Sequence, residues 1–384
     1  MSEILYSDML IVSNLKRGAR MNQTEKIQSY LQLHQIDAAF ITTPDNVFYF
    51  TGFKSNPHER LLGVAIFKEA APFIICPKME IPDAKAAGWN GEIIGHQDTE
   101  NAWDVLVQKI NATVGNIESI AVEKSHMTVE RLEALEERIA TLQVSRIDEK
   151  INDLRVIKSE AELINMRKAA ELADYAIEVG CKEIAEGKTE LEILNAIELA
   201  VKQKGATQMS FDTMVLSGPK TASPHGTPGD RKIQKGDFIL FDLGVVYNGY
   251  CSDITRTVAF GEPTPEKREI YETVRRAEEA AVAAVKPGIT AMALDKIARD
   301  IITEAGYGDY FTHRLGHGLG ISVHEFPSIT GVNEMKLETG MVFTIEPGIY
   351  HPEITGVRIE DDVVVTENGV EVLTKFPKEL QIFS

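Results

Sequence analysis

Four acidic residues and one histidine interrupt apolar, strand-like runs in the C-terminal half of the chain. They are Asp242 in FILFDLG, Asp253 in CSDITRT, His317 in LGHGLG, Glu346 in FTIEPG and Glu360 in VRIEDD. An isolated charge is costly to bury unless a partner or a metal ion neutralises it. Any one of these acids alone is more simply interpreted as a turn or helix cap than as a metal ligand. The five together suit a pair of divalent cations such as Mn²⁺, Co²⁺ or Zn²⁺, and they predict a two-metal site.

The dipeptide Asn248-Gly249 predicts a tight hairpin. Residues 237–260 read as two β-rich runs on either side of it. Asn-Gly strongly favours a two-residue turn between antiparallel strands. Such a turn pairs Tyr247 with Tyr250, and this pairing fixes the register of both strands.

The same register places two of the acids relative to each other. Counting back from the turn sets Asp242 opposite Thr255. Asp253 then lies two residues off register on the partner strand, so both carboxylates point to one face as diagonal neighbours. Diagonal neighbours lie roughly 7–8 Å apart, and two metal ions about 3.5–4 Å apart would fit between such side chains.

Glu346 and Glu360 flank a loop at residues 350–356. The runs MVFTIEPGIY and GVRIEDDVVV predict two more adjacent strands around this loop. Strand alternation sends Asp361 to the face opposite Glu360. We therefore expect Asp361 to be solvated or to cap a neighbouring element.

The histidines gather in the same part of the chain. His313 and His317 have helical i, i+4 spacing, but the alternating glycines of GHGLG disfavour a helix and predict a strand or loop. One histidine is then expected to bind metal, while its neighbours handle protons or substrate near neutral pH. His225, in SGPKTASPHGTPGD, reads by itself as a surface-loop residue.

Four motifs together closely resemble the pita-bread metallopeptidases, a family that includes methionine aminopeptidase, aminopeptidase P, prolidase and creatinase. They are FDLGVVYNGYCSDITRT, HRLGHGLGISVHE, IEPGIY and GVRIEDD. LRVIKSEAELINMRKAA at 154–170 resembles the helix that opens the catalytic domain of this family. All five metal-ligand positions of the family are matched, which argues against creatinase itself, since that enzyme works without metal.

The resemblance implies two domains. Residues 21–150 resemble the creatinase-type N-terminal domain, and their alternating strand and helix patterns indicate an α/β fold. Residues 151–384 are expected to form an α+β pita-bread catalytic domain. Residues 1–20 match nothing in the family pattern and are expected to be an extension of unknown role. Helices are predicted near 159–186, 189–204, 264–286 and 290–305.

The resemblance also implies a role for each ligand. Asp242 would bind one metal ion in bidentate fashion, and His317 and Glu346 would bind the other. Asp253 and Glu360 would bridge the two ions. A water held between them would lose a proton and attack the scissile carbonyl. Glu346 resembles the carboxylate that passes the proton to the leaving amine.

Four further residues match positions around the family's substrate. His225 and His324 resemble the two histidines that contact substrate and the tetrahedral intermediate. His313 matches another pocket histidine. Arg358, two residues before Glu360, would share its face and could pair with a carboxylate of ligand or substrate.

The N-terminal domain bears on the choice among peptidases. TGFKSNPHERLLG contains His58 and Arg60, and in dimeric prolidases a loop of this character reaches the partner subunit's active site. An equally good interpretation is a solvated polar loop. A prolidase acting on Xaa-Pro dipeptides is the first hypothesis, and aminopeptidase P, acting on longer Xaa-Pro peptides, is the second. A catalytically inactive pita-bread binding module is a third, and it predicts neither bound metal nor turnover.

Composition excludes several other classes. A net charge of −18 disfavours nucleic-acid binding, which requires clustered Lys and Arg. The sequence contains no apolar run of about 18 residues, so no membrane span is predicted. Three scattered cysteines indicate neither a disulfide framework nor a zinc ribbon. The start lacks the pattern of a secretory signal, so a cytoplasmic protein is expected. The family resemblance implies a homodimer.

Overall fold

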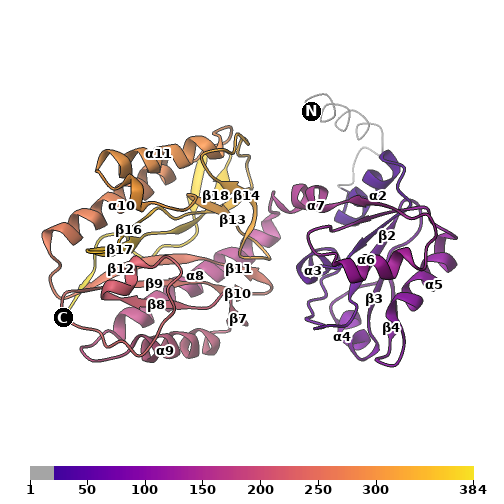
Figure 1. Cartoon of the computed structure of the whole chain (residues 1–384), viewed down its shortest axis with the longest axis horizontal. Coiled ribbons are helices and arrows are strands. Elements are labelled where there is room, and N and C mark those ends of the chain that lie inside the picture. The colour runs from indigo at the N-terminus through magenta and orange to yellow at the C-terminus, as the bar shows by residue number, and fades with distance from the viewer. Residues whose placement is uncertain (1–20) are drawn as a thin grey trace. The chain divides into compact units, whose positions relative to one another are not determined.

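The computed structural model describes residues 21–384, which divide into two units (Figure 1). The first unit ends at Ile151, and the second comprises Asn152–Ser384. The helix α7 (Asp148–Arg155) spans this division. The extension predicted for residues 1–20 lies outside the described residues.

The first unit is built around one mixed sheet, in the order β4-β3-β2-β1-β5-β6. Strand β1 pairs antiparallel with β2 and parallel with β5. The strands are β1 (Ala38–Ile41), β2 (Gly63–Phe67), β3 (Phe73–Pro77), β4 (Glu92–His96), β5 (Ser119–Val122) and β6 (Gln143–Arg146). The helices are α2 (Gln23–Leu33), α3 (Pro44–Thr51), η2 (Lys78–Glu80), α4 (Ile81–Ala86), α5 (Ala102–Val114) and α6 (Val129–Glu136).

Both faces of this sheet are buried, which explains the continuous apolar runs of its central strands. Strands β2 and β3 are buried along their whole length. Successive residues of β3 belong to two different core clusters. Phe73 packs in a cluster that includes Leu106 of α5, and Ile74 packs in one that includes Val47 of α3 and Ala84 of α4. The predicted α/β fold is confirmed.

Antiparallel strands and two helix pairs make up the second unit. The two larger sheets run in the orders β20-β12-β9-β8 and β14-β13-β15-β18-β19. Their strands are β8 (Met214–Ser217), β9 (Asp237–Leu243), β12 (Ile254–Phe260), β13 (Gly316–Gly318), β14 (Glu325–Ile329), β15 (Val342–Ile345), β18 (Asp361–Thr366), β19 (Gly369–Val372) and β20 (Ile382–Phe383). The smaller sheets join β11 (Tyr250–Cys251), β10 (Val245–Tyr247) and β7 (Gln208–Met209), and pair β16 (Gly348–His351) with β17 (Thr355–Arg358).

Each larger sheet is covered by one helix pair, as Figure 1 shows for α9 on one side of the strands and α10 and α11 on the other. The helices are α8 (Glu160–Lys182), α9 (Glu190–Gln203), α10 (Pro265–Ala284) and α11 (Ala291–Glu304), with short turns η3 (Gly218–Ala222) and η4 (Gly308–Tyr310). Ile177 and Ile197 pack on Phe241 of β9. Val274 and Leu294 lie in the cluster that contains Phe343 of β15. The four predicted helices and the α+β class are confirmed.

The hairpin predicted from Asn248-Gly249 is present in the predicted register. Tyr247 pairs with Tyr250, and Asp242 pairs with Thr255 further along the same two strands. Both turn residues have positive φ, which Asn and Gly tolerate better than other residues. The two Asp-bearing runs are therefore held side by side by a turn that the sequence specifies locally.

A second hairpin brings Glu360 to the first. Strands β16 and β17 pair antiparallel between Glu346 and Glu360, as predicted. The backbone N–H of Glu360 then donates to the carbonyl of Thr255 at 3.1 Å, forming an isolated bridge between the hairpins. This bridge joins β12 of one larger sheet to the residue before β18 of the other, at the position where the acids lie.

The expectation that Asp361 is solvated or capping was wrong. Its side chain is fully buried; Arg256 Nη2 donates to Oδ1 at 2.7 Å, and Lys378 Nζ lies 2.5 Å from Oδ2. Lys378 also contacts the buried Glu278. The face opposite Glu360 is therefore core, and Asp361 is tolerated there because two cations neutralise it.

Candidate metal centre

Five different backbone segments deliver the predicted ligands. Asp242 lies near the end of β9, Asp253 immediately precedes β12, and His317 is the central residue of β13. Glu346 follows β15, and Glu360 precedes β18. All five are buried except Glu346, which is partly exposed, and all five line one cavity of about 540 Å³.

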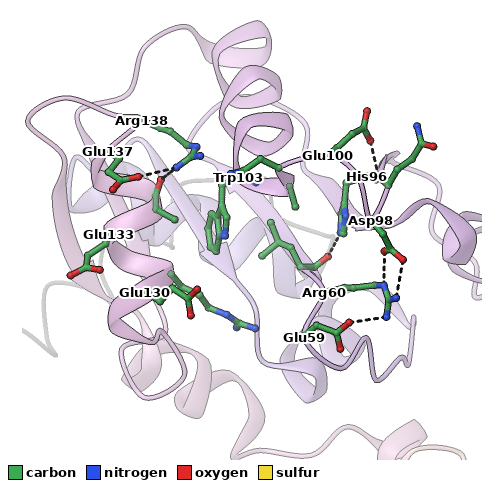
Figure 2. A pocket seen from close by; sticks show the side chains of 16 residues that line it. Glu59, Arg60, His96, Asp98, Glu100, Trp103, Glu130, Glu133, Glu137 and Arg138 are labelled. Carbon is green, nitrogen blue, oxygen red and sulfur yellow. Dashed lines mark hydrogen bonds and ion pairs between the residues drawn. The ribbon is translucent and has the colours of Figure 1, made fainter.

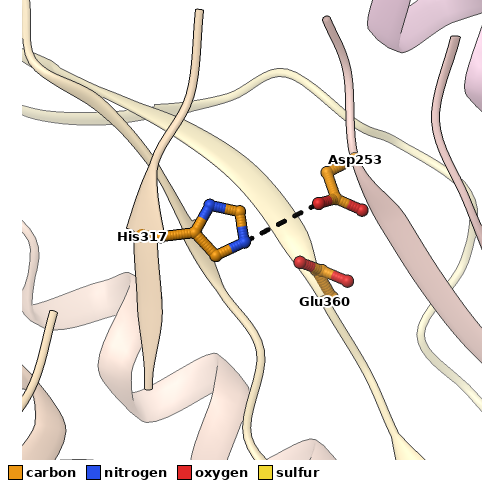
Figure 3. A group of neighbouring side chains, drawn as sticks. All are labelled: Asp253, His317 and Glu360. Carbon is orange, nitrogen blue, oxygen red and sulfur yellow. Dashed lines mark ion pairs between the residues drawn. The ribbon is translucent and has the colours of Figure 1, made fainter. Parts of the chain in front are cut away.

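Three of these side chains converge tightly. One ligand atom each from Asp253, His317 and Glu360 lies within 4.8 Å of the others (Figure 3). Glu346 Oε1 is 3.3 Å from His317 Nε2, and Asp253 Oδ2 is 3.8 Å from the same nitrogen. Asp242 lines the cavity beside them and forms an ion pair with Arg358.

Asp253 supplies the observation that a cation fits here. Its Oδ1 is buried and has no hydrogen-bond partner among residues 21–384. A buried carboxylate oxygen without a donor is costly, and a divalent ion would satisfy it. Oxygen ligands with a single imidazole are the donor set that Mn²⁺, Co²⁺ and Zn²⁺ accept.

Electrostatics in the cavity lead to the same conclusion. Burial and then the neighbouring carboxylates raise the pKa values of Asp253 and Glu360 well above the ordinary range. Burial raises the pKa of Glu346 to about 7, against the opposing charge of Arg358. Burial, reinforced by His324, lowers the pKa of His317 to about 3, so its imidazole is neutral, the form that binds metal.

Neighbouring groups orient the ligands from outside. Thr255 Oγ1 donates to Glu360 at 2.6 Å. The backbone N–H of Asp253 donates to Asp362 Oδ2 at 2.9 Å. The first contact holds the ligand carboxylate in a fixed orientation, and the second fixes the backbone of Asp253; contacts that orient ligands typically contribute to metal affinity.

The three non-ligand histidines lie in the same cavity. The ring of His324 stands edge-on to that of His317, with centroids 4.2 Å apart, and burial lowers its pKa. His225 lines the cavity while remaining exposed. His313 bonds through Nε2 to the Tyr350 hydroxyl at 2.9 Å.

Arg358 is fixed within this set. It is buried, donates from Nη1 to the Tyr350 hydroxyl at 2.7 Å and forms its ion pair with Asp242. The chain Arg358–Tyr350–His313 therefore connects one predicted ligand to a pocket histidine. Tyr350 was not predicted as a site residue, although it is the last residue of the IEPGIY motif.

Five other cavity-lining residues were not predicted from the sequence. They are Phe211, Met214, Pro224, Arg314 and Val323. Pro224 and Val323 directly precede His225 and His324, whereas Phe211 and Met214 lie outside the quoted motifs. Arg314 follows His313 within HRLGHG, so its neighbour in the motif was the available clue.

His58 and Arg60 belong to the first unit. Arg60 donates to both oxygens of Asp98 at 2.7 and 2.9 Å and lies 3.2 Å from Glu59 (Figure 2). His58 is exposed and has a positive φ. The guanidinium of Arg60 is therefore already neutralised by carboxylates of its own unit.

Comparison with known proteins identifies the class. The sequence model for metallopeptidase family M24 matches residues 164–367, and that for the creatinase/prolidase N-terminal domain matches residues 23–157. A putative dipeptidase of Bacillus subtilis, YkvY, is 51% identical over 362 residues, which cover 94% of this chain and 100% of that protein. The chain belongs to metallopeptidase family M24, which implies the use of divalent metal ions.

Solved structures agree with this membership. The prolidase of Pyrococcus horikoshii superposes with a TM-score of 0.86 at 40% identity, covering 93% of this chain and 99% of that one. An X-Pro aminopeptidase of Thermotoga maritima gives 0.84 at 33% identity, covering 94% and 100%. Among the described residues, no helix has the length and apolar character needed to cross a membrane.

Proposed function

We propose that this chain is a prolidase, a two-metal exopeptidase that hydrolyses the Xaa–Pro bond of dipeptides. The observation that carries the proposal is the convergence of Asp253, His317 and Glu360 within 4.8 Å, in the cavity that Asp242 and Glu346 also line. The similarity to a prolidase at 40% identity supports the substrate class.

The five residues divide between two ions in this proposal. Asp242 would hold one ion, His317 and Glu346 would hold the other, and Asp253 and Glu360 would serve both. Two bound divalent ions supply an acidified water and stabilise the negative charge that develops on the scissile carbonyl oxygen. Mn²⁺ or Co²⁺ are the first candidates and Zn²⁺ is the third, because this ligand set accepts all of them.

The remaining side chains act on substrate and protons. Glu346 takes a proton during attack and returns it to the proline nitrogen as the bond breaks. His324, kept neutral by burial, and His225 donate hydrogen bonds to substrate and to the tetrahedral intermediate. Arg358, held by Asp242 and Tyr350, keeps a fixed positive charge beside the reacting carbonyl.

Aminopeptidase P activity at the same metal centre is the alternative. It is supported by the similarly close superposition of the Thermotoga maritima X-Pro aminopeptidase. An inactive binding module is disfavoured by the intact set of five ligand residues and by the unpartnered buried oxygen of Asp253. We also propose a cytoplasmic homodimer, on the family resemblance. For His58 and Arg60 we propose the solvated polar loop, because Arg60 is already paired.

Matched substrates test the proposal. Enzyme stripped of metal and reloaded with Mn²⁺ or Co²⁺ is assayed on Met-Pro and on Met-Pro-Ala. Selective cleavage of Met-Pro is the expected result. Preferred cleavage of Met-Pro-Ala would assign the chain to aminopeptidase P, and cleavage of neither by protein that holds two ions would overturn the Xaa-Pro substrate class.

A further inference from the structure

We infer that Arg314 binds the free carboxylate of the proline residue in a dipeptide substrate and thereby restricts the site to dipeptides. The inference rests on the proposed prolidase function and deepens it by assigning the residue that reads substrate length. Arg314 belongs to the second unit, follows His313 in the sequence and lines the cavity that contains the metal ligands.

Two arginines line this cavity, and they differ in what they already bind. Arg358 is buried and committed to Asp242 and Tyr350. Arg314 is half-buried, and its recorded side-chain contact within residues 21–384 is a 3.3 Å hydrogen bond from Nη1 to the hydroxyl of Ser328. No carboxylate of the described chain forms an ion pair with it. Its guanidinium is thus available to an anion that enters the cavity.

The position of Arg314 suits the geometry of the substrate. In an Xaa-Pro dipeptide the carboxylate is carried by the carbon next to the scissile nitrogen, so its receptor must lie in the same cavity as the ligands. Arg314 meets this requirement, since it lines the same cavity as all five predicted metal ligands. A guanidinium also matches a carboxylate through two parallel hydrogen bonds.

Arg60 is the competing candidate, and its contacts argue against it. Asp98 accepts two hydrogen bonds from Arg60, and Glu59 lies beside the same guanidinium. A second carboxylate would have to displace these partners, whereas Arg314 would have to give up only a hydroxyl contact.

The same contact explains selection against longer peptides. In an Xaa-Pro-peptide an uncharged amide replaces the proline carboxylate. Arg314 would then face the bound substrate without a counter-charge in a cavity that has lost its water. A site built for a polar group rejects analogues that lack it, because its own groups are left unpaired.

The test compares Met-Pro with Met-Pro-amide, which differs only in the charged group. Wild type, Arg314→Gln, Arg314→Lys, Arg60→Gln and a control, Arg268→Gln, are each loaded with Mn²⁺. Arg268 is a surface residue of α10 that pairs with Glu262 and does not line the cavity.

Arg314→Gln is expected to raise KM for Met-Pro by about 10- to 100-fold, the usual loss for a charge-assisted hydrogen bond, with kcat much less affected. Its kcat/KM for Met-Pro-amide should stay within about 2-fold of wild type.

Arg314→Lys should raise KM for Met-Pro less than Arg314→Gln does, since lysine restores the positive charge but not the two parallel hydrogen bonds of a guanidinium. Calorimetric binding of L-proline and of prolinamide gives a readout independent of turnover, and Arg314→Gln should weaken only L-proline. Equal effects on both substrates, no effect on either, or a carboxylate-selective loss in Arg60→Gln instead would overturn the inference. Wild type that cleaves neither substrate would overturn the proposed function, and this inference with it.

Discussion

Asp253 is the residue on which the centre depends most directly. It lies at the meeting point of the two hairpins, its backbone is fixed by Asp362, and its Oδ1 has no protein donor within the described residues. Its other oxygen, Oδ2, lies 3.8 Å from His317 Nε2. The carboxylate of Asp253 is therefore oriented toward the space that two ions would share.

Replacing Asp253 by Asn keeps its shape and removes its charge. We expect the variant to hold fewer than two ions per chain after dialysis and to hydrolyse Met-Pro more than about 100-fold more slowly, since even outer-shell partners of ligands contribute about 10- to 100-fold. Elemental analysis and turnover measure the two effects. Asp300→Asn, on the exposed face of α11, should retain both ions; full activity and two ions in Asp253→Asn would remove this residue from the ligand set.

At the scale of elements, the β9–β12 hairpin sets the spacing between two ligands. Its ladder is interrupted between the Leu243–Ile254 and Val246–Cys251 pairs, where Gly244 passes close to the other strand. A Cβ atom on Gly244 would lie 1.9 Å from the carbonyl oxygen of Ser252, the residue before Asp253. The close approach of these backbones requires glycine.

Gly244→Ala should therefore push the two strands apart beside Asp242 and Asp253, although the added methyl group is small. We expect a loss of stability of about 1–3 kcal/mol from overpacking, together with weaker Mn²⁺ binding. Thermal unfolding of metal-free protein and calorimetric titration measure the two effects. Gly229→Ala is the control, because its Cβ would meet only the Lys220 ammonium, at an ordinary contact distance of 3.4 Å. Equal behaviour of the two variants would contradict the close approach proposed at Gly244.

The elements also show what the sequence could and could not predict. The Asn248-Gly249 turn is a local signal, so the register of Asp242 with Thr255 followed by counting. The burial of Asp361 was not predicted. It depends on ion pairs with Arg256 and Lys378, which are too far from Asp361 along the chain to form a local sequence pattern. Cavity-lining residues such as Phe211 were missed for the same reason, since only the fold brings them to the ligands.

At the scale of the whole molecule, the centre couples stability to pH and metal. Asp253 and Glu360 have pKa values raised well above the ordinary range, and that of Glu346 is raised to about 7. At these three carboxyls the metal-free folded state binds more protons than the unfolded state, where they titrate at about 4. Their contribution to stability therefore falls as the pH rises from about 4 toward 7.

Metal ions reverse this trend, because they bind the deprotonated carboxylates and release their protons. The rise in unfolding temperature on adding Mn²⁺ should be small at pH 5 and should grow steadily toward pH 7.5. Thermal unfolding of stripped and reloaded protein across this range measures it, with Ca²⁺, which prefers six to eight oxygen ligands, as a comparison ion. A rise independent of pH would contradict the raised pKa values.

The order of the ligands along the chain fixes when activity can begin during protein synthesis. Asp242 and Asp253 can be paired by their hairpin soon after they leave the ribosome, but Glu360 reaches Thr255 only after the strands that follow it in the sheet have emerged. Domains generally fold from the N-terminus as translation proceeds. A nascent chain therefore carries an incomplete metal centre until translation is nearly finished.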